Sequence, residues 1–381
     1  MNFEFATTTR TIFGAGKLAE LGDLAVGFGS RALLVTGARS TPTRTILSLL
    51  QRVGIQATPY AVASEPTIAM VEAGLALGRT TQSDFVIACG GGSVLDTGKA
   101  IAALLANAGA VRDYLEIVGS GRKLTRSSRP FIAIPTTSGT GTEVTRNAVL
   151  SVPEQRIKVS LRSALMLPTV ALIDPELTYA LPPKLTASSG MDALTQLIEP
   201  FVCRRANPLT DAICREGIPL AAKSLPQAFH DGTNSVARAN LSLASWFGGL
   251  ALANAGLGAV HGLAGPIGGM FPAPHGAICA ALLPHVMAMN IRALERNDAS
   301  RERYDEVARI LTGNASASAL AGVDWVAGLV RDLRIPGLSA YGISRRHTAE
   351  LVAKAAQASS MKANPVALSA AELSAVLSAA L

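Results

Sequence analysis

The sequence predicts an α/β domain with a parallel sheet, followed by an all-α domain. Two observations predict this order. Short, fully apolar runs alternate with helical patterns in the first half, whereas the second half consists of long Ala- and Leu-rich segments without a convincing strand. The length of 381 residues also indicates two domains, because a single hydrophobic core usually stops growing below about 300 residues.

Four apolar runs are expected to be strands: residues 32–36 (ALLVT), 85–89 (FVIAC), 131–134 (FIAI) and 169–173 (TVALI). Helices are expected over residues 44–53 and 94–106. Strands that are apolar throughout and separated by helices are typical of a parallel sheet covered on both faces.

The domain boundary is expected at Pro182 and Pro183, where one pattern ends and the next begins. We therefore predict an α/β domain over residues 1–181 and a helical domain over residues 182–381. A last helix over residues 369–380 should pack on the helical domain.

Composition argues against nucleic-acid and membrane partners. The formal net charge is +7, but the basic residues are scattered and aromatic residues make up only 4% of the chain, so no stacking platform is expected. The longest nearly apolar stretch, residues 246–260, is shorter than the roughly 20 residues of a membrane span and is expected to be one closely packed, buried helix. The N-terminus shows no export signal, so a cytoplasmic location is expected.

The four cysteines are Cys89, Cys203, Cys214 and Cys279. They form no C-x-x-C pair, so we expect free thiols and no cysteine metal site.

Two loops follow predicted strands and are suited to phosphate. Residues 90–93 (GGGS) lie between a buried strand and the helix that carries Asp96 and Lys99, where glycine amides and the helix N-terminus form an anion site. The spacing is neither G-x-G-x-x-G nor a nucleotide-triphosphate loop, and a triple glycine alone is also typical of a tight turn. Residues 135–143 (PTTSGTGTE) follow the next strand. Their hydroxyl groups and glycines are suited to hydrogen bonds with a phosphate-containing ligand, and a polar surface turn is the alternative interpretation.

A second group of residues has the chemistry of metal ligands. Asp192, Gln196 and Glu199 fall on one face of a predicted helix, and His261 and His275 come later. A carboxylate with two imidazoles suits Zn or Fe(II) and leaves a position for a substrate oxygen. Two ordinary helix-terminal histidines are the alternative.

Six segments resemble, in order, the signatures of the iron-containing (group III) alcohol dehydrogenase family: GGGSVLDTGKAIA, IPTTSGTGTEVTR, LPTVALIDPEL, GMDALTQLIEPFV, NAGLGAVHG and PHGAICAALLPHV. The resemblance implies a dinucleotide-binding α/β domain and a helical domain that holds the metal and the substrate. It implies pyrophosphate contacts from Gly91, Gly92, Ser93 and Asp96, further cofactor contacts from Thr136, Thr137, Thr140, Thr145 and Lys158, and metal ligands at Asp192, Gln196, His261 and His275. Asp192, His261 and His275 are the implied catalytic residues.

The chain departs from the family pattern at two positions. Gln196 stands where most members have a histidine ligand, and Gly265 stands where most have a second histidine four residues after the first. An amide oxygen is a weaker ligand for Zn or Fe(II) than imidazole. Similar glycerol dehydrogenases work with one Asp and two His, whereas metal-free maleylacetate reductases typically lack the carboxylate that Asp192 supplies, so a metal is expected.

Cofactor choice is expected to depend on the end of the strand over residues 32–36. NAD-preferring relatives often carry an aspartate at the position of Gly37, where it binds the ribose 2′-hydroxyl. Gly37 lacks that carboxylate, and Arg39 is placed to pair with a 2′-phosphate, so NADP is favoured over NAD.

The resemblance implies an NAD(P)-dependent, metal-assisted alcohol dehydrogenase or aldehyde reductase that acts on a small alcohol or aldehyde, as a homodimer. A metal-free oxo-acid reductase resembling maleylacetate reductase is the near alternative. A dehydroquinate synthase-type lyase, which shares the architecture and the metal, is the more distant one.

Overall fold

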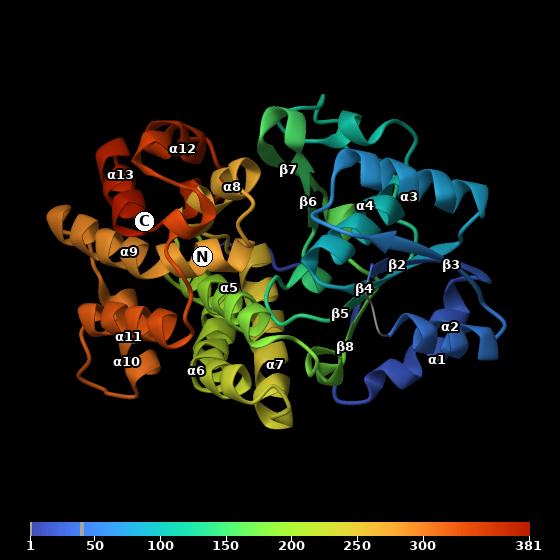
Figure 1. Ribbon diagram of the computed structural model, residues 1–381, viewed down its shortest axis with the longest axis horizontal. Helices are drawn as coiled ribbons and strands as arrows, with labels where there is room; N and C mark the ends of the chain where they lie inside the picture. Colours follow the sequence, from blue (N-terminus) through green and yellow to red (C-terminus); the bar gives the residue numbers. More distant parts are fainter. Residues whose placement is uncertain (1, 39–41) are drawn as a thin grey trace. The chain divides into compact units, whose positions relative to one another are not determined.

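The computed structural model describes residues 2–38 and 42–381. The chain forms two compact units (Figure 1). An α/β unit contains Ala6–Thr137 and Gly141–Tyr179, and a helical unit contains Ala180–Leu381 together with residues 2–5 and the short segment Ser138–Thr140.

The α/β unit is built on a six-stranded parallel sheet. Its order is β1 (Arg10–Phe13), β8 (Val170–Ile173), β5 (Phe131–Pro135), β4 (Phe85–Gly90), β2 (Arg31–Gly37) and β3 (Gln56–Val62). The four predicted apolar runs are confirmed as β2, β4, β5 and β8, which all lie inside the sheet. The two edge strands, β1 and β3, were not predicted, because their partly exposed residues break the continuous apolar pattern.

Helices cover both faces of this sheet. Leu34 and Ile87 point to the face packed by α1 (Leu21–Ala25) and α2 (Thr43–Arg52), while Leu33 and Val86 point to the face packed by α3 (Ile68–Thr80) and α4 (Gly92–Ala106). Successive strand residues thus point to opposite faces, and each face has its own apolar core. The predicted α/β class with a doubly covered parallel sheet is confirmed.

A small antiparallel hairpin, β6 (Asn147–Val152) and β7 (Ile157–Arg162), belongs to the same unit and was not predicted. Its strand β6 alternates half-buried and buried residues, a pattern with too few consecutive apolar positions to stand out in the sequence. The hairpin is tied to α4, because the Val149 amide donates to Asp96 Oδ2 at 3.0 Å.

The helical unit packs around one large apolar core. Its helices are α5 (Pro183–Val202), α6 (Pro208–His230), α7 (Ser235–Asn254), α8 (Ala259–Met270), α9 (His275–Arg296), α10 (Glu302–Thr312), α11 (Ala319–Asp332), α12 (Thr348–Ala356) and α13 (Ala370–Ala379). No strand occurs in the described part of this unit, in agreement with the predicted all-α class. Helix α5 begins at Pro183, a residue well suited to a first helical position, and is buried along its whole second half.

The apolar stretch over residues 246–260 is not the single helix that the sequence predicted. Helix α7 ends at Asn254 and α8 begins at Ala259, with a bend of 98° between them. Gly256 has φ of 115°, which side-chain-bearing residues rarely adopt, so the chain turns there.

One helix in the described ranges, α9, is long and apolar enough to cross a membrane by length and composition. The expectation that no segment reaches this length was therefore wrong. Of its apolar window, 78% is buried inside the structure, as in the core helix of a folded domain.

Candidate functional site

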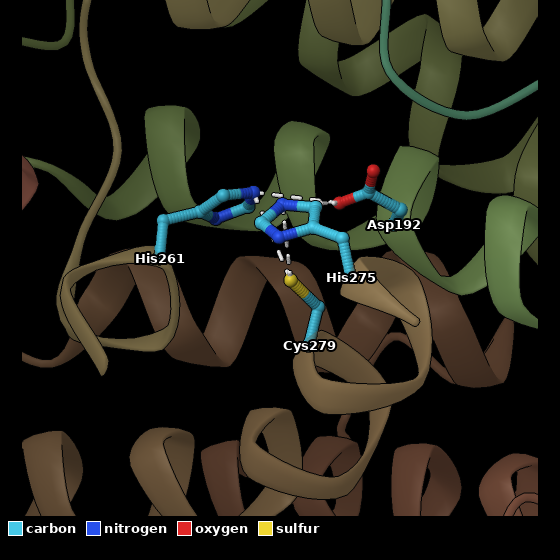
Figure 2. A group of neighbouring side chains, drawn as sticks. All are labelled: Asp192, His261, His275 and Cys279. Carbon is cyan, nitrogen blue, oxygen red and sulfur yellow. Dashed lines mark hydrogen bonds and ion pairs between the residues drawn. The ribbon is translucent and has the colours of Figure 1, made fainter. Parts of the chain in front are cut away.

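Three helices of the helical unit bring four ligand-type side chains together. Asp192 comes from α5, His261 from α8, and His275 and Cys279 from the first turns of α9 (Figure 2). One ligand atom from each side chain lies within 4.8 Å of all the others. The predicted residues Asp192, His261 and His275 thus meet at one point, although they are up to 83 positions apart in the sequence, from 192 to 275.

The carboxylate of Asp192 faces both imidazoles. Its Oδ1 atom lies 3.4 Å from His261 Nε2 and 3.7 Å from His275 Nε2. Oδ1 is buried, and none of its contacts has hydrogen-bond geometry. A buried carboxylate oxygen without a hydrogen bond is costly unless a cation satisfies it, so these donors fit a divalent metal ion.

A close helix contact places His275 beside Asp192. A Cβ atom added at Gly276 would lie 2.0 Å from the Ser188 carbonyl oxygen and 3.2 Å from Asp192 Cβ. Only glycine lets α9 approach α5 this closely. Residues four apart on a helix share a face, so Cys279 follows His275 into the same cluster.

Glu199 holds the ring of His261 in place. Its Oε2 atom lies 2.6 Å from His261 Nδ1, and its Oε1 accepts a hydrogen bond of 2.7 Å from the Val260 amide. A proton on Nδ1 that is donated to Glu199 leaves Nε2 as a lone-pair donor toward Asp192 and the cluster. Carboxylates commonly orient metal-binding imidazoles in this way.

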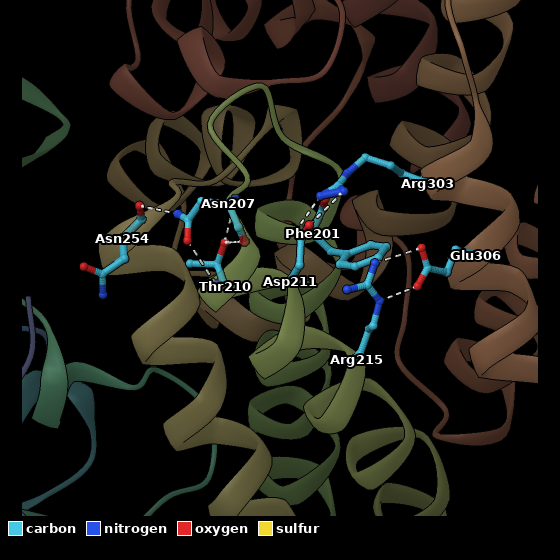
Figure 3. A network of polar contacts seen from close by, with 8 residues as sticks. All are labelled: Phe201, Asn207, Thr210, Asp211, Arg215, Asn254, Arg303 and Glu306. Carbon is cyan, nitrogen blue, oxygen red and sulfur yellow. Dashed lines mark hydrogen bonds and ion pairs between the residues drawn. The ribbon is translucent and has the colours of Figure 1, made fainter. Parts of the chain in front are cut away.

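The far end of α5 is anchored by a polar network (Figure 3). Arg303 of α10 donates to the Phe201 carbonyl at 2.7 Å and pairs with Asp211 of α6. Asn207 caps α6 by accepting from the Thr210 amide at 3.2 Å. The Arg303 contact holds the end of the helix that carries Asp192 and Glu199, and the Asn207 cap holds the start of the next helix.

The four ionisable groups shift one another's pKa. Burial lowers the pKa of His261 and His275, but the nearby Cys279 thiolate and Asp192 carboxylate raise it above the ordinary value. Burial raises the pKa of Asp192 and Cys279, but the two imidazoles lower it below the ordinary value. Anionic sulfur and carboxylate are therefore favoured next to positive charge.

Gln196 and Gly265 are the positions that depart from the family pattern. Gln196 lies one turn after Asp192 on α5, and its Oε1 atom is buried without a hydrogen-bond partner. The assignment of Gln196 as a ligand stays a prediction. A Cβ atom added at Gly265 would meet nothing within 4 Å, so there is open space where relatives carry the second histidine.

In the α/β unit, the predicted cofactor loops meet at the carboxyl edge of the sheet. Gly37, Gly90 and Pro135 end the adjacent strands β2, β4 and β5. Gly91 caps α4 without any side-chain hydrogen bond, and a Cβ atom added there would lie 3.4 Å from Thr137. An uncapped helix N-terminus beside two loops is suited to a pyrophosphate group.

Lys99 stabilises the loop that follows β5 at the carboxyl edge of the sheet. Its ammonium group is completely buried and donates to the carbonyls of Thr142, Thr145 and Asn147 at 2.7, 2.8 and 3.0 Å, and to Thr145 Oγ1 at 3.0 Å. Burial lowers the pKa of Lys99 to about 8 and raises that of the neighbouring Glu143 to about 7. Lys99 thus shapes the loop from which the cofactor contacts are predicted.

The remaining predicted cofactor residues lie in several places. Gly92 and Ser93 begin α4, and Thr136 follows β5. Thr140 falls in the short segment that belongs to the helical unit. Lys158, on β7, pairs with Glu65 at 2.6 Å, and Arg39 lies outside the described residues. The cofactor roles of Asp96, Thr145 and these residues stay predictions.

Sequence reasoning missed Cys279, and it placed Glu199 on the same helix face as Asp192 without assigning it the contact with His261. No cysteine was expected at a metal site, whereas the structure places Cys279 within a group of side chains that could hold a metal ion. Its signal was present in the sequence as the spacing His275-x-x-x-Cys279, which places both side chains on one helix face. The cysteines are free thiols, as predicted.

Comparison with known proteins covers both units. The family model described as iron-containing alcohol dehydrogenase matches residues 8–175, and the C-terminal model of the Fe-containing alcohol dehydrogenase family matches residues 186–381. Alcohol dehydrogenase 4 of Saccharomyces cerevisiae (strain YJM789) is 38% identical over 303 residues, which are 78% of this chain and 77% of the relative. 1,3-Propanediol dehydrogenase of Klebsiella pneumoniae is 36% identical over 319 residues, or 82% and 80% of the two chains. A crystal structure of 1,3-propanediol oxidoreductase matches with a TM-score of 0.93 over 100% of both chains, at 32% identity.

Proposed function

The chain belongs to the iron-containing alcohol dehydrogenase family, and on this premise we propose that it interconverts a small alcohol and its aldehyde with a metal ion at the Asp192 cluster. It is an oxidoreductase that acts on CH–OH groups with NAD(P) as hydride carrier. The substrate, the preferred dinucleotide and the metal are the parts of this proposal that need direct tests.

The observation that carries the proposal is the convergence of Asp192, His261 and His275 around a buried, unpartnered carboxylate oxygen. When bound there, a divalent metal supplies Lewis-acid polarisation of the substrate carbonyl oxygen. The protein's own contribution is orientation. Glu199 keeps His261 Nε2 directed at the cluster, and Gly276 lets α9 bring His275 to Asp192.

The carboxyl edge of the sheet supports the cofactor proposal. The glycine loop and the uncapped start of α4 provide backbone amides for a pyrophosphate. We propose NADP(H) as the preferred form, because Gly37 ends β2 without the carboxylate that would repel a 2′-phosphate. NAD(H) is the alternative.

Small alcohols and aldehydes are the proposed substrates, in line with the relative named as a 1,3-propanediol dehydrogenase. The open space at Gly265 favours a substrate that fills the volume taken by a histidine side chain in other members. We further propose a cytoplasmic homodimer without nucleic-acid or membrane partners.

The decisive experiment is a panel of short aldehydes and oxo-acids assayed by nicotinamide absorbance with NADPH and with NADH. The protein is purified without chelator, stripped with EDTA, and reloaded with Zn(II) or Fe(II). We expect aldehyde reduction that is lost on stripping and restored by metal, with a lower KM for NADPH. Full activity on oxo-acids in EDTA would favour the metal-free reductase, and cofactor turnover without net change in absorbance would favour the lyase.

A further inference from the structure

We propose that the Cys279 thiolate is a metal ligand, so that the protein donates one carboxylate, two imidazoles and one thiolate, and that this set selects Zn(II) over Fe(II). The inference rests on the proposed metal-assisted function. It goes beyond that function by assigning a fourth donor from α9 and, with it, the identity of the metal.

The distances within the cluster support a fourth donor. Cys279 Sγ lies 3.7 Å from His275 Nε2 and 3.9 Å from His261 Nε2, and Asp192 Oδ1 lies 3.4 and 3.7 Å from His261 Nε2 and His275 Nε2. Zinc bonds of about 2.0–2.1 Å to nitrogen and oxygen and about 2.3 Å to sulfur place tetrahedral donors about 3.4 Å apart for O and N and about 3.6 Å apart for N and S. These four O–N and N–S separations therefore match the corresponding edges of a coordination tetrahedron to within about 0.4 Å, and all four ligand atoms lie within 4.8 Å of one another.

A second observation independently indicates a cation. The Asp192 side chain is only 3% exposed, and its Oδ1 atom, which faces both imidazoles, has no hydrogen-bond partner. Cys279 is completely buried and directs its sulfur to the same imidazole atoms (Figure 2). One ion at the centre of the four donors satisfies all of them together, and a substrate oxygen would then bind as a fifth donor.

Cys279 differs in this respect from the other buried cysteines. Cys214 and Cys279 are both fully buried among the apolar core residues of the helical unit, so burial does not distinguish them. Among the described residues, Cys279 is the cysteine that belongs to a group of three or more metal donors. Burial alone therefore does not account for its position.

The donor set determines which metal is favoured. A thiolate is a soft ligand that favours zinc, whereas an amide oxygen such as that of Gln196 is hard and weak. Cys279 from α9 thus replaces the nitrogen donor that Gln196 on α5 cannot supply. As the metal binds, the sulfur–metal bond forms, the thiol S–H bond breaks, and the proton leaves to the solvent, without any redox change.

The first test is spectroscopic and needs no turnover. The metal-free protein is loaded with Co(II), whose bonds to thiolate give a charge-transfer absorption in the near ultraviolet. We expect this band in the wild type and in the control variant Cys214→Ser, and its loss in Cys279→Ser. Thermal unfolding of each metal-free variant checks that the fold persists.

The second test begins with the wild type alone, so its first measurement does not depend on the folding of any variant. Zinc-edge X-ray absorption of the zinc-loaded protein should show one sulfur at about 2.3 Å. In competition with a chelator, Cys279→Ser should lose at least about tenfold in zinc affinity and much less in Fe(II) affinity, whereas Cys214→Ser should lose neither.

The outcomes separate this inference from the proposed function. A sulfur-free zinc shell, a band that survives Cys279→Ser, or no Co(II) binding to the wild type would each overturn the assignment of Cys279. A sulfur-containing shell in a protein that reduces no aldehyde would leave the ligand assignment standing and refute the proposed function.

Discussion

Replacing Glu199 by glutamine tests whether that residue positions the metal-binding imidazole. Both carboxylate oxygens are used, one by the Val260 amide at 2.7 Å and one by His261 Nδ1 at 2.6 Å. A glutamine has a single acceptor oxygen, so its NH₂ group must face one of these two donors. Glu199→Gln therefore removes one charge-assisted hydrogen bond and places the glutamine NH₂ group, a donor, next to another N–H donor.

The size of the effect follows from that loss. A hydrogen bond to a charged group contributes about 1.5–3 kcal/mol, which corresponds to roughly 10–100-fold in an equilibrium constant. Loss of an outer partner of a metal-bound histidine commonly weakens metal affinity by the same factor. We expect zinc affinity to fall about 10–100-fold, and kcat at saturating metal to fall with it.

The assay is a chelator competition on Glu199→Gln, the wild type and the control Glu302→Gln, which alters an exposed glutamate at the start of α10. Unfolding of the metal-free proteins is measured in parallel. Zinc affinity within about twofold of the wild type, in a folded variant, would refute the positioning role. An equal loss in the control would show that the effect is not specific to Glu199.

Three further predictions concern the packing and the loops. Gly276→Ala should destabilise the protein by about 1–3 kcal/mol in urea unfolding and weaken metal binding, because the added methyl group would lie 2.0 Å from the Ser188 carbonyl. Lys99→Met should lower the free energy of unfolding by several kcal/mol, because each buried carbonyl left without a donor costs about 1–3 kcal/mol. The same substitution should raise the Kd for NADPH measured by fluorescence. Burial raises the pKa of Glu143 from 4.5 to about 7, so the folded state holds this proton more tightly and stability should fall as pH rises through that window. Glu143→Gln should remove on the order of 3 kcal/mol of that fall in unfolding free energy, and an unchanged pH profile of urea unfolding would contradict the assignment.

The sequence patterns predicted the central strands of the sheet but not its edge strands or the hairpin. Strands β2, β4, β5 and β8 are covered on both faces, so their residues are apolar throughout, except for Arg31 and Thr36 near the ends of β2. The edge strand β3 and the hairpin strand β6 each have a more exposed side, and this mixes polar residues into the run. A search for continuous apolar segments therefore finds the buried central strands and misses strands with one exposed side.

The site was predictable to a similar extent. Asp192, His261 and His275 were found from residue type and family resemblance, and the structure brings them together. Cys279 was set aside because it belongs to no cysteine pair in the sequence. Its role depends on α9 approaching α5, which Gly276 permits and which no local pattern expresses.

The charges of the donor atoms affect how strongly the cation is held. A divalent cation held by one carboxylate and neutral imidazoles keeps one positive charge uncompensated by its own ligands, while the Glu199 carboxylate against His261 lies outside the ligand set. With the Cys279 thiolate as a further donor, the ligands themselves carry two negative charges against the two positive ones. The same neutralisation weakens the pull of the cation on a substrate oxygen, so the gain in zinc binding opposes Lewis acidity. If Cys279 is a ligand, tighter zinc binding should therefore be accompanied by weaker polarisation of the substrate oxygen.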